Sequence, residues 1–144
     1  MRVESPMNVT KCEQETIDYA IAFAKRISAP ALLLLEGDLG AGKTCFVRGL
    51  CEGLGGDPGQ VSSPTFAIMQ EYDVANNLRL VHIDAYRLSG EEELESIGWD
   101  ELLEEENTII AIEWPSRIAN AIPEHGNTVQ IAHIDLHSRE ITIK

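Results

Sequence analysis

The chain has 144 residues, a length that fits a single domain over residues 1–144 and leaves no room for a second lobe. Its formal net charge of −13 disfavours strong direct contact with nucleic acid, because neutralising phosphates requires clustered lysine and arginine. No stretch approaches the roughly 20 apolar residues of a membrane span, and carboxylates interrupt the region where a signal peptide would be apolar. We therefore expect a cytoplasmic protein without membrane contact.

The first element predicted along the chain is a helix. Thr10 and Glu13 have the spacing of a capping box, and apolar residues then recur at helical spacing from Ile17 to Ala24. Pro30 closes this segment before the first apolar run.

A phosphate-binding pattern lies between a predicted strand and a predicted helix. Residues 31–35 are wholly apolar, as in a buried parallel strand, and residues 45–50 continue as a helix with an apolar face. The pattern G-x-x-x-x-G-K-[ST] is complete in Gly37, Asp38, Leu39, Gly40, Ala41, Gly42, Lys43 and Thr44. A glycine-rich turn that caps a structural helix is the alternative, and the context of strand, loop and helix favours nucleotide binding.

The residue types of this loop suit a nucleoside triphosphate such as ATP. Glycines let the backbone curl so that successive N–H groups and the first helical turn point at phosphates. Lys43 would reach the β- and γ-phosphates as a point charge, and the Thr44 hydroxyl would ligate a Mg²⁺ ion bridging the same oxygens. We therefore predict an ATP and Mg²⁺ site at the carboxyl end of the strand.

The middle of the chain predicts a hairpin and then an acidic helix. Residues 66–72 and 78–84 read as strands on either side of Asn76-Asn77, which predicts an antiparallel hairpin. Residues 91–106 are mostly helical in pattern and hold nine acidic residues and no basic one. This segment is either a solvated helical face or an acidic docking surface for a basic partner.

The last elements complete an alternation of strands and helices. Residues 108–112 form a second wholly apolar run, as expected of a central parallel strand. Residues 129–136 and 140–144 alternate around His137-Ser138 and predict a closing hairpin. This order favours an α/β layer fold.

Two carboxylates follow predicted strands, where a magnesium ion held at the phosphate loop would need them. Glu113 follows residues 109–112 and ranks first, as a magnesium ligand through water or as the group that orients the attacking water. Asp84 follows residues 80–83 and is the second candidate. A purely structural Glu113 would need a partner such as an arginine, and Asp84 could instead cap the next turn or pair with Arg87.

Three further residues have roles that the sequence leaves open. Thr65, in the run SSPTF at 62–66, is a candidate sensor that would complete the magnesium shell when the γ-phosphate is present, but such a run also suits a plain turn. His82 is more typical of a packed or hydrogen-bonded residue than of a catalyst. Trp114 could cover the nucleotide site or fill the core.

The chain resembles the TsaE (YjeE) family in four motifs that occur in the family's order: GDLGAGKT, SPTF, HIDAYRL and EWP. The resemblance implies a bacterial P-loop ATPase needed for threonylcarbamoyladenosine in transfer RNA. In this family, the TsaD and TsaB pair transfers the threonylcarbamoyl group, and TsaE binds that pair and hydrolyses ATP to reset it. The implied fold is a three-layer α/β/α sandwich with a parallel central sheet and antiparallel edge strands. An acidic surface suits a protein partner of this kind.

The resemblance also assigns site residues one by one. They are the loop from Gly37 to Thr44, with Lys43 at the phosphates and Thr44 at the magnesium ion, Thr65 as the switch threonine, Asp84 and Glu113 near the metal, and Trp114 beside the nucleotide. Cys45 would border the phosphates at a position where relatives commonly carry a second threonine. An oxidisable thiol there would add redox sensitivity.

Two other functions stay open at this point. A small-molecule kinase would use a carboxylate such as Asp84 as a base toward an acceptor hydroxyl. Such kinases usually add an arginine-rich lid, and Arg87 and Arg117 are the only well-placed arginines. A non-hydrolysing sensor would bind ATP only to select a conformation that binds a partner.

Overall fold

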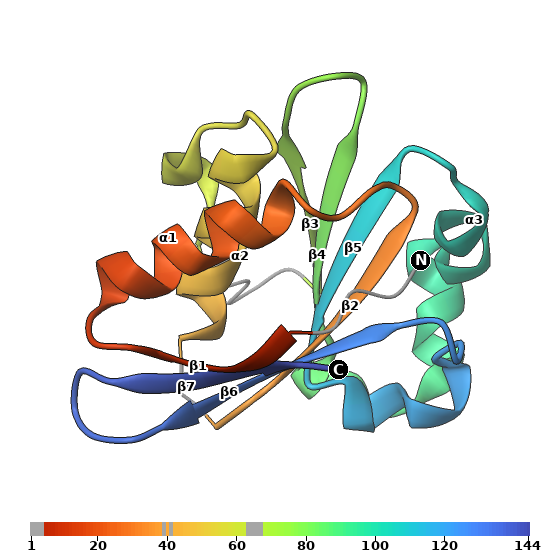
Figure 1. The fold of residues 1–144 in the computed structure, drawn as a ribbon. Coiled ribbons are helices and arrows are strands. Elements are labelled where there is room, and N and C mark those ends of the chain that lie inside the picture. Colours follow the sequence, from red (N-terminus) through yellow and green to blue (C-terminus); the bar gives the residue numbers. More distant parts are fainter. Residues whose placement is uncertain (1–4, 39, 41, 63–67) are drawn as a thin grey trace.

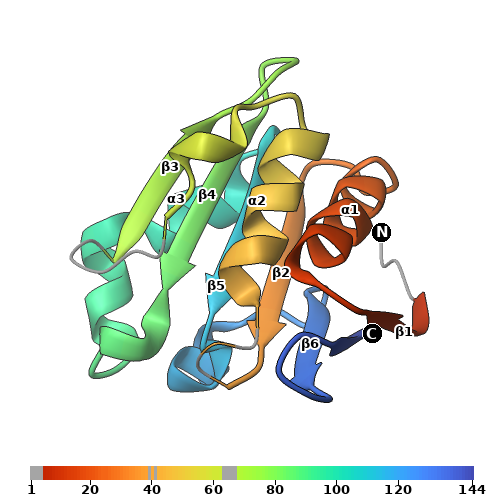
Figure 2. The ribbon, with the colours of Figure 1, turned by 90° about the vertical axis from the view of Figure 1, so that its left-hand side faces the viewer.

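A seven-stranded sheet in the order β1-β7-β6-β2-β5-β4-β3 forms the centre of the computed structural model, with helical layers on both faces (Figure 1 and Figure 2). The structure describes residues 5–38, 40, 42–62 and 68–144. The strands are β1 (Ser5–Thr10), β2 (Ala31–Glu36), β3 (Met69–Asp73), β4 (Arg79–Asp84), β5 (Thr108–Glu113), β6 (Asn127–His133) and β7 (Arg139–Ile143). The α-helices are α1 (Glu13–Ala24), α2 (Lys43–Gly53) and α3 (Trp99–Glu104). Within these described ranges no helix is both long enough and apolar enough to cross a membrane.

Strands β6, β2, β5 and β4 run parallel at the centre of the sheet. The layers on both faces explain why the β2 and β5 sequences are continuous apolar runs. Strands β1, β7 and β3 pair antiparallel toward the two edges. The predicted α/β fold, with a parallel centre and antiparallel edge strands, is therefore confirmed.

Helices α1 and α2 cover one face of the sheet and pack closely on each other (Figure 2). A Cβ atom placed at Gly49 would lie 2.4 Å from the Cβ of Ala20, and one placed at Gly53 would lie 2.7 Å from the Cβ of Ala24. The close approach therefore requires glycine at both positions of α2. The core beneath the helix pair includes Phe23, Phe46, Leu33, Leu35 and Leu50.

Short helical segments cover the opposite face (Figure 1). They are the 3-10 helices η3 (Glu91–Ile97) and η4 (Pro115–Ala121), together with α3. Leu94, Trp99 and Leu102 are buried toward the sheet, whereas the acidic residues of 91–106 are exposed or half-buried. The helical prediction for this segment is confirmed in type, but Gly98 has a φ of 71° and divides the segment into η3 and α3.

The amino-terminal segment differs from the prediction in two respects. Thr10 and Glu13 form no capping box, because Thr10 ends β1 and its hydroxyl lies 2.7 Å from that of Thr16. Instead, α1 begins at Glu13, and the backbone N–H of Lys11 donates to the carboxylate of Glu15. The sequence pattern does not predict β1, since its partner β7 lies at the other end of the chain.

Both predicted hairpins are present. β3 pairs antiparallel with β4, and β6 pairs antiparallel with β7. Asn76 and Asn77 have φ values of 63° and 58°, the left-handed pair that a tight type I′ turn needs. The strand predicted over 66–72 is described from Met69 to Asp73, and residues 66 and 67 lie outside the described part.

Candidate nucleotide site

The described phosphate-loop residues, Gly37, Asp38, Gly40 and Gly42, lie at the carboxyl end of β2, where the chain passes into α2 (Figure 2). β5 and β6 flank β2 on opposite sides, and open parallel sheets bind ligands at such positions. Gly40 and Gly42 have φ values of 78° and 106°, a left-handed backbone that favours glycine. Leu39 and Ala41 lie outside the described residues. The described part of the loop thus has the backbone form that its glycines predict.

The first turn of α2 has the properties of an anion site. Its N-cap is Gly42, and no side chain in the described structure caps it. A Cβ atom placed at Gly40 would meet no atom within 4 Å, so this part of the loop borders open space. Backbone N–H groups at a helix start, next to such open space, suit a phosphate group.

Lys43 is almost buried, with 5% of its surface exposed. Its Nζ donates a hydrogen bond of 2.8 Å to the carbonyl oxygen of Gly37. Burial lowers the pKa of Lys43, whereas three carboxylates oppose that shift, those of Glu113, Asp84 and Asp38. The predicted phosphate-binding lysine and both predicted metal carboxylates therefore lie in one electrostatic environment.

Glu113 ends β5 with only 6% of its surface exposed. Its Oε2 lies 2.6 Å from Nε2 of His82, which is fully buried. Nδ1 of the same ring lies 2.9 Å from the hydroxyl of Tyr72. The partner that a buried carboxylate needs is therefore a histidine rather than an arginine. The prediction that His82 is packed and hydrogen-bonded is confirmed.

Asp84 stands beside Glu113 in the sheet, because the two residues are register partners on β4 and β5. Its Oδ1 accepts a 3.0 Å hydrogen bond from the backbone N–H of Tyr86, so Asp84 caps the short 3-10 helix Ala85–Arg87. No ion pair between described residues joins Asp84 to Arg87. Capping occupies one carboxylate oxygen and leaves the other available to the site.

Trp114 borders the site rather than filling the core. Its backbone is left-handed, with a φ of 59°, and its side chain is half-buried. The Lys43 Nζ lies 3.8 Å from the centroid of the Trp114 ring, within cation–π distance. The ring centroids of Trp114 and Tyr86 are 5.1 Å apart. An open cleft of about 640 Å³ on this side is lined by Trp114 together with Gly37 and Asp38.

A second cleft, of about 290 Å³, brings the remaining predicted residues together. Its lining comprises Glu13, Gly40, Gly42, Lys43, Thr44, Cys45, Arg48 and Glu113. The lysine, the predicted magnesium-binding hydroxyl of Thr44 and the carboxylate of Glu113 thus face a single cavity.

Cys45 is a buried free thiol in this cleft. Burial raises the pKa of Cys45, and the negative charge of Glu13 acts in the same direction. A raised pKa lowers the thiolate fraction, and the thiolate is the form that oxidants attack. The environment therefore argues against the redox sensitivity expected at this position.

Three predicted residues, Leu39, Ala41 and Thr65, lie outside the described part of the chain, and two contributors to the site were not predicted from the sequence. Tyr72 supports His82 from β3, and Arg139 donates from β7 to the carbonyl of Gly40 at 3.3 Å. A tyrosine in a strand and an arginine at the start of an edge strand are ordinary locally, so only the three-dimensional pairing identifies them.

The donor set fits a magnesium ion that arrives with a nucleotide. Among the described residues, no group of three histidine, cysteine, aspartate or glutamate side chains could hold a metal ion. Magnesium in phosphate loops needs no such group, because water, phosphate oxygens and one hydroxyl supply most of its ligands. Thr44 offers the hydroxyl, while Glu113 and Asp84 could each bind through water.

Known proteins similar to this chain point to one family. The family model described as threonylcarbamoyl adenosine biosynthesis protein TsaE matches residues 10–141. The tRNA threonylcarbamoyladenosine biosynthesis protein TsaE of Treponema pallidum is 34% identical over 135 residues, which cover 94% of this chain and 97% of that protein. The protein of the same name from Bacillus subtilis is 41% identical over 111 residues, covering 77% and 67%.

A solved structure agrees with these sequence relatives. The crystal structure of Bacillus subtilis YdiB superposes with a TM-score of 0.76 at 30% sequence identity. The match covers 99% of this chain and 87% of that one, so the similarity extends over the whole α/β fold.

Proposed function

The chain belongs to the TsaE family and takes part in the biosynthesis of threonylcarbamoyladenosine in transfer RNA, and we propose that it does so as a magnesium-dependent ATPase. The proposal rests above all on the joint placement of Lys43 and Glu113 on one cleft at the start of α2. This cleft combines backbone donors for phosphate with a lysine and a buried carboxylate.

Each side chain has a defined part in this proposal. Lys43 exchanges its bond to the Gly37 carbonyl for bonds to phosphate oxygens, and the Thr44 hydroxyl would be a ligand of the magnesium ion. Glu113 accepts a hydrogen bond from the attacking water and so orients it, while Asp84 would hold the ion through a water. Magnesium, when bound, neutralises charge on the phosphate oxygens.

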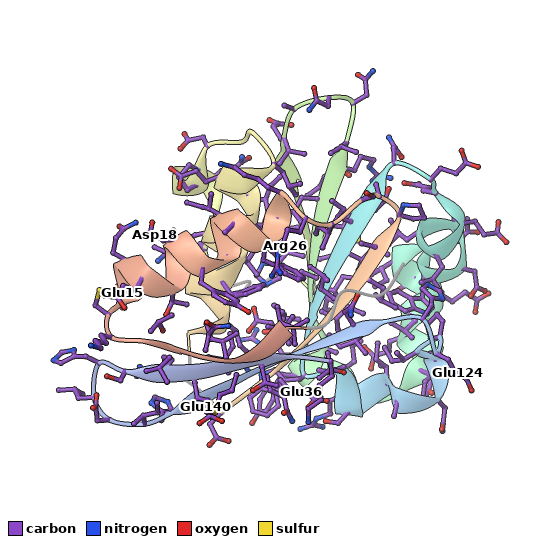
Figure 3. All side chains as sticks on the ribbon, viewed as in Figure 1. Glu15, Asp18, Arg26, Glu36, Glu124 and Glu140 are labelled. Atoms are coloured by element: carbon purple, nitrogen blue, oxygen red, sulfur yellow. The ribbon has the colours of Figure 1, made fainter. Side chains whose placement is uncertain are left out.

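The proposed partners are proteins of the TsaD and TsaB type, in the cytoplasm where transfer RNA is modified. The charge supports a protein partner rather than direct RNA contact, since repulsion from phosphate grows with net negative charge. Figure 3 shows the labelled carboxylates of Glu15, Asp18, Glu36, Glu124 and Glu140 on several sides of the molecule. Basic surfaces on the partner would complement them.

Part of the acidic segment 91–106 is engaged in contacts within the fold. Glu105 bonds to Arg79 and Thr108, and Glu93 bonds to the backbone N–H of Ser89, so both have roles within the fold. The remaining carboxylates of the segment either serve solubility or contact the partner, the two alternatives that follow from the sequence.

The kinase alternative has less support in the described residues. The Arg117 guanidinium stacks 5.0 Å from the Tyr86 ring centroid. The expectation that only Arg87 and Arg117 are well placed is wrong, because Arg48 lines the cleft and Arg139 contacts the Gly40 carbonyl. Both of these arginines lie on core elements, α2 and β7, rather than on a lid over phosphates. The non-hydrolysing sensor would use the same pocket and differs only in turnover.

The test is phosphate release from ATP by the protein alone and with a TsaD and TsaB mixture, with and without magnesium. We expect magnesium-dependent release that rises with the partners and is lost in Lys43→Ala. ATP binding without release in either condition would favour the sensor. Transfer of phosphate to a small acceptor instead of water would favour the kinase.

A further inference from the structure

Three side chains form a buried hydrogen-bonded chain that ends at the cleft. The Tyr72 hydroxyl lies 2.9 Å from Nδ1 of His82, and Nε2 of His82 lies 2.6 Å from Oε2 of Glu113. Tyr72 is 3% exposed and His82 is 0% exposed, whereas Glu113 lines the cleft. Only the last member of the chain therefore reaches the proposed nucleotide site.

The strand register explains why these residues meet. β3, β4 and β5 lie side by side (Figure 2). His82 pairs with Ala111, so Glu113 lies two residues along on the same face of β5, a diagonal neighbour within side-chain reach. Tyr72 is likewise two residues from Gln70, the partner of His82 on β3. The chain of contacts thus crosses three strands on the face that carries α2.

The contacts of Tyr72 fix the far end of this chain. Its hydroxyl lies 2.8 Å from Oε1 of Gln70 and 3.3 Å from the backbone carbonyl of Ser62. The rings of Tyr72 and His82 also pack together, with centroids 5.8 Å apart. His82 consequently has both ring nitrogens engaged, and rotating its ring would break both hydrogen bonds.

The direction of the bond to Glu113 follows from the chemistry of the two groups. An ionised carboxylate can only accept hydrogen bonds, so Nε2 of His82 carries the proton and donates. The bond occupies Oε2 and restricts the rotation of the Glu113 side chain. Oε1 is therefore the carboxylate oxygen that can face the cleft. A carboxylate without this bond would be free to turn toward the ammonium of Lys43.

We propose that His82 is a positioning residue, which holds the Glu113 carboxylate in the orientation that orients the attacking water, while Tyr72 holds the His82 ring. The inference rests on the proposed ATPase function. His82 touches neither the nucleotide nor the water in this arrangement and acts only through Glu113. A histidine that merely filled a polar gap in the core would contribute to folding stability but not to the rate of the chemical step.

The substitutions His82→Leu and His82→Gln separate these two roles. Leucine removes the donor, whereas the glutamine amide can replace the Nε2 donor to Glu113. We expect kcat for ATP hydrolysis with TsaD and TsaB to fall about 10- to 100-fold in His82→Leu and to recover substantially in His82→Gln. KM and the Kd for ATP should stay near the wild-type values in both. Tyr72→Phe should give a smaller loss of kcat.

Matched controls keep this comparison specific. His125→Gln changes an exposed histidine remote from the cleft, and Tyr19→Phe removes a hydroxyl elsewhere; both should retain wild-type kcat. The thermal unfolding of every variant is also measured, so that a loss of kcat caused by unfolding can be recognised. The kinetics of all variants are compared at a temperature below the lowest melting temperature. Equal kcat in His82→Leu and the wild type would overturn the proposal.

A double substitution tests whether His82 acts through Glu113. In a Glu113→Gln background, His82→Leu should cause no further loss of kcat, because the group that it positions is already gone. A loss of kcat in the double variant equal to the product of the losses in His82→Leu and Glu113→Gln would contradict the proposal. If the wild type releases no phosphate at all, the proposed ATPase function fails, and the positioning of Glu113 must then be judged by a readout without turnover.

That readout is the imidazole ¹⁵N spectrum of the protein without nucleotide. The chain has four histidines, and comparison with His82→Gln assigns the signals of His82. We expect a protonated Nε2 whose signal shifts in Glu113→Ala and a ring signal that broadens in Tyr72→Phe. An unprotonated Nε2, or His82 signals that do not change in either Glu113→Ala or Tyr72→Phe, would overturn the proposal independently of any activity.

Discussion

Asp84 and Glu113 are register partners at the ends of two adjacent parallel strands, β4 and β5. The pleat directs both side chains to the face that carries α2, beside the start of the phosphate-loop helix. Their surroundings nevertheless differ: Glu113 is buried against His82, whereas Asp84 is half-buried and caps a turn. The two carboxylates are therefore expected to differ in function.

Asp84→Asn should weaken magnesium binding more than ATP binding. The amide keeps the cap to the Tyr86 backbone N–H through its oxygen but removes the negative charge that would hold a metal-bound water. We expect the magnesium concentration for half-maximal phosphate release to rise about 10- to 100-fold. Glu52→Gln, an exposed position on α2, serves as the control. An unchanged magnesium dependence would exclude this role of Asp84.

ATP binding should change the fluorescence of Trp114. The Lys43 ammonium lies 3.8 Å from the ring centroid, and it must leave that position to reach phosphates. The chain has two tryptophans, so a Trp99→Phe background isolates the signal of Trp114. We expect a shift in emission on adding a non-hydrolysable ATP analogue, and no shift when Lys43→Met is added. A constant spectrum at saturating analogue would contradict this movement of Lys43.

Gly49→Ala should destabilise the protein by weakening the contact between α1 and α2. The new Cβ would lie 2.4 Å from the Cβ of Ala20 and 2.5 Å from the carbonyl oxygen of Ile17, so the helices must separate. Overpacking of this kind costs about 1–3 kcal/mol. Urea unfolding should show a lower midpoint with an unchanged slope. Glu52→Ala on the same helix should show little change, and equal midpoints for both variants would refute the packing argument.

The Tyr72 phenol should lose its proton only at strongly alkaline pH. Burial raises the pKa of Tyr72 from 10.0 to about 12. Between pH 10 and about 12 the unfolded chain therefore loses this proton while the folded chain keeps it. The stability contributed by the neutral phenol is present below pH 10 and is lost as the pH rises through that interval.

The measurement for Tyr72 is the difference in phenolate absorbance between the wild type and Tyr72→Phe during an alkaline titration. The difference should develop above pH 10, and the stability of Tyr72→Phe should decline less over the same interval. Phenolate formation by Tyr72 at pH 10, while the protein is still folded, would show that the hydroxyl is not buried as the structure has it.

Local sequence patterns were sufficient for the elements that form the phosphate loop. The apolar run before Gly37 and the apolar spacing after Thr44 specify a buried strand and a packed helix without help from distant residues. The hairpin turn at Asn76-Asn77 is equally local, since both residues tolerate left-handed backbone.

The remaining features depend on contacts between distant parts of the chain. Thr10 has the sequence of a helix cap, but pairing of β1 with β7 places it in a strand. Glu113 meets His82 only through the register of β4 and β5, 31 residues apart, so no spacing rule in the sequence predicts that bond. Trp114 is similar, because its place beside Lys43 depends on a left-handed backbone that a tryptophan does not predict.

The most direct test of the proposed function is a single-turnover measurement on Glu113→Gln beside the wild type, with TsaD, TsaB, magnesium and radiolabelled ATP. The substitution keeps the size of the side chain and removes its charge. We predict ATP binding close to that of the wild type and phosphate release slower by about 100-fold or more. Phosphate release at the wild-type rate would show that Glu113 does not orient the attacking water and would contradict the proposed catalytic site.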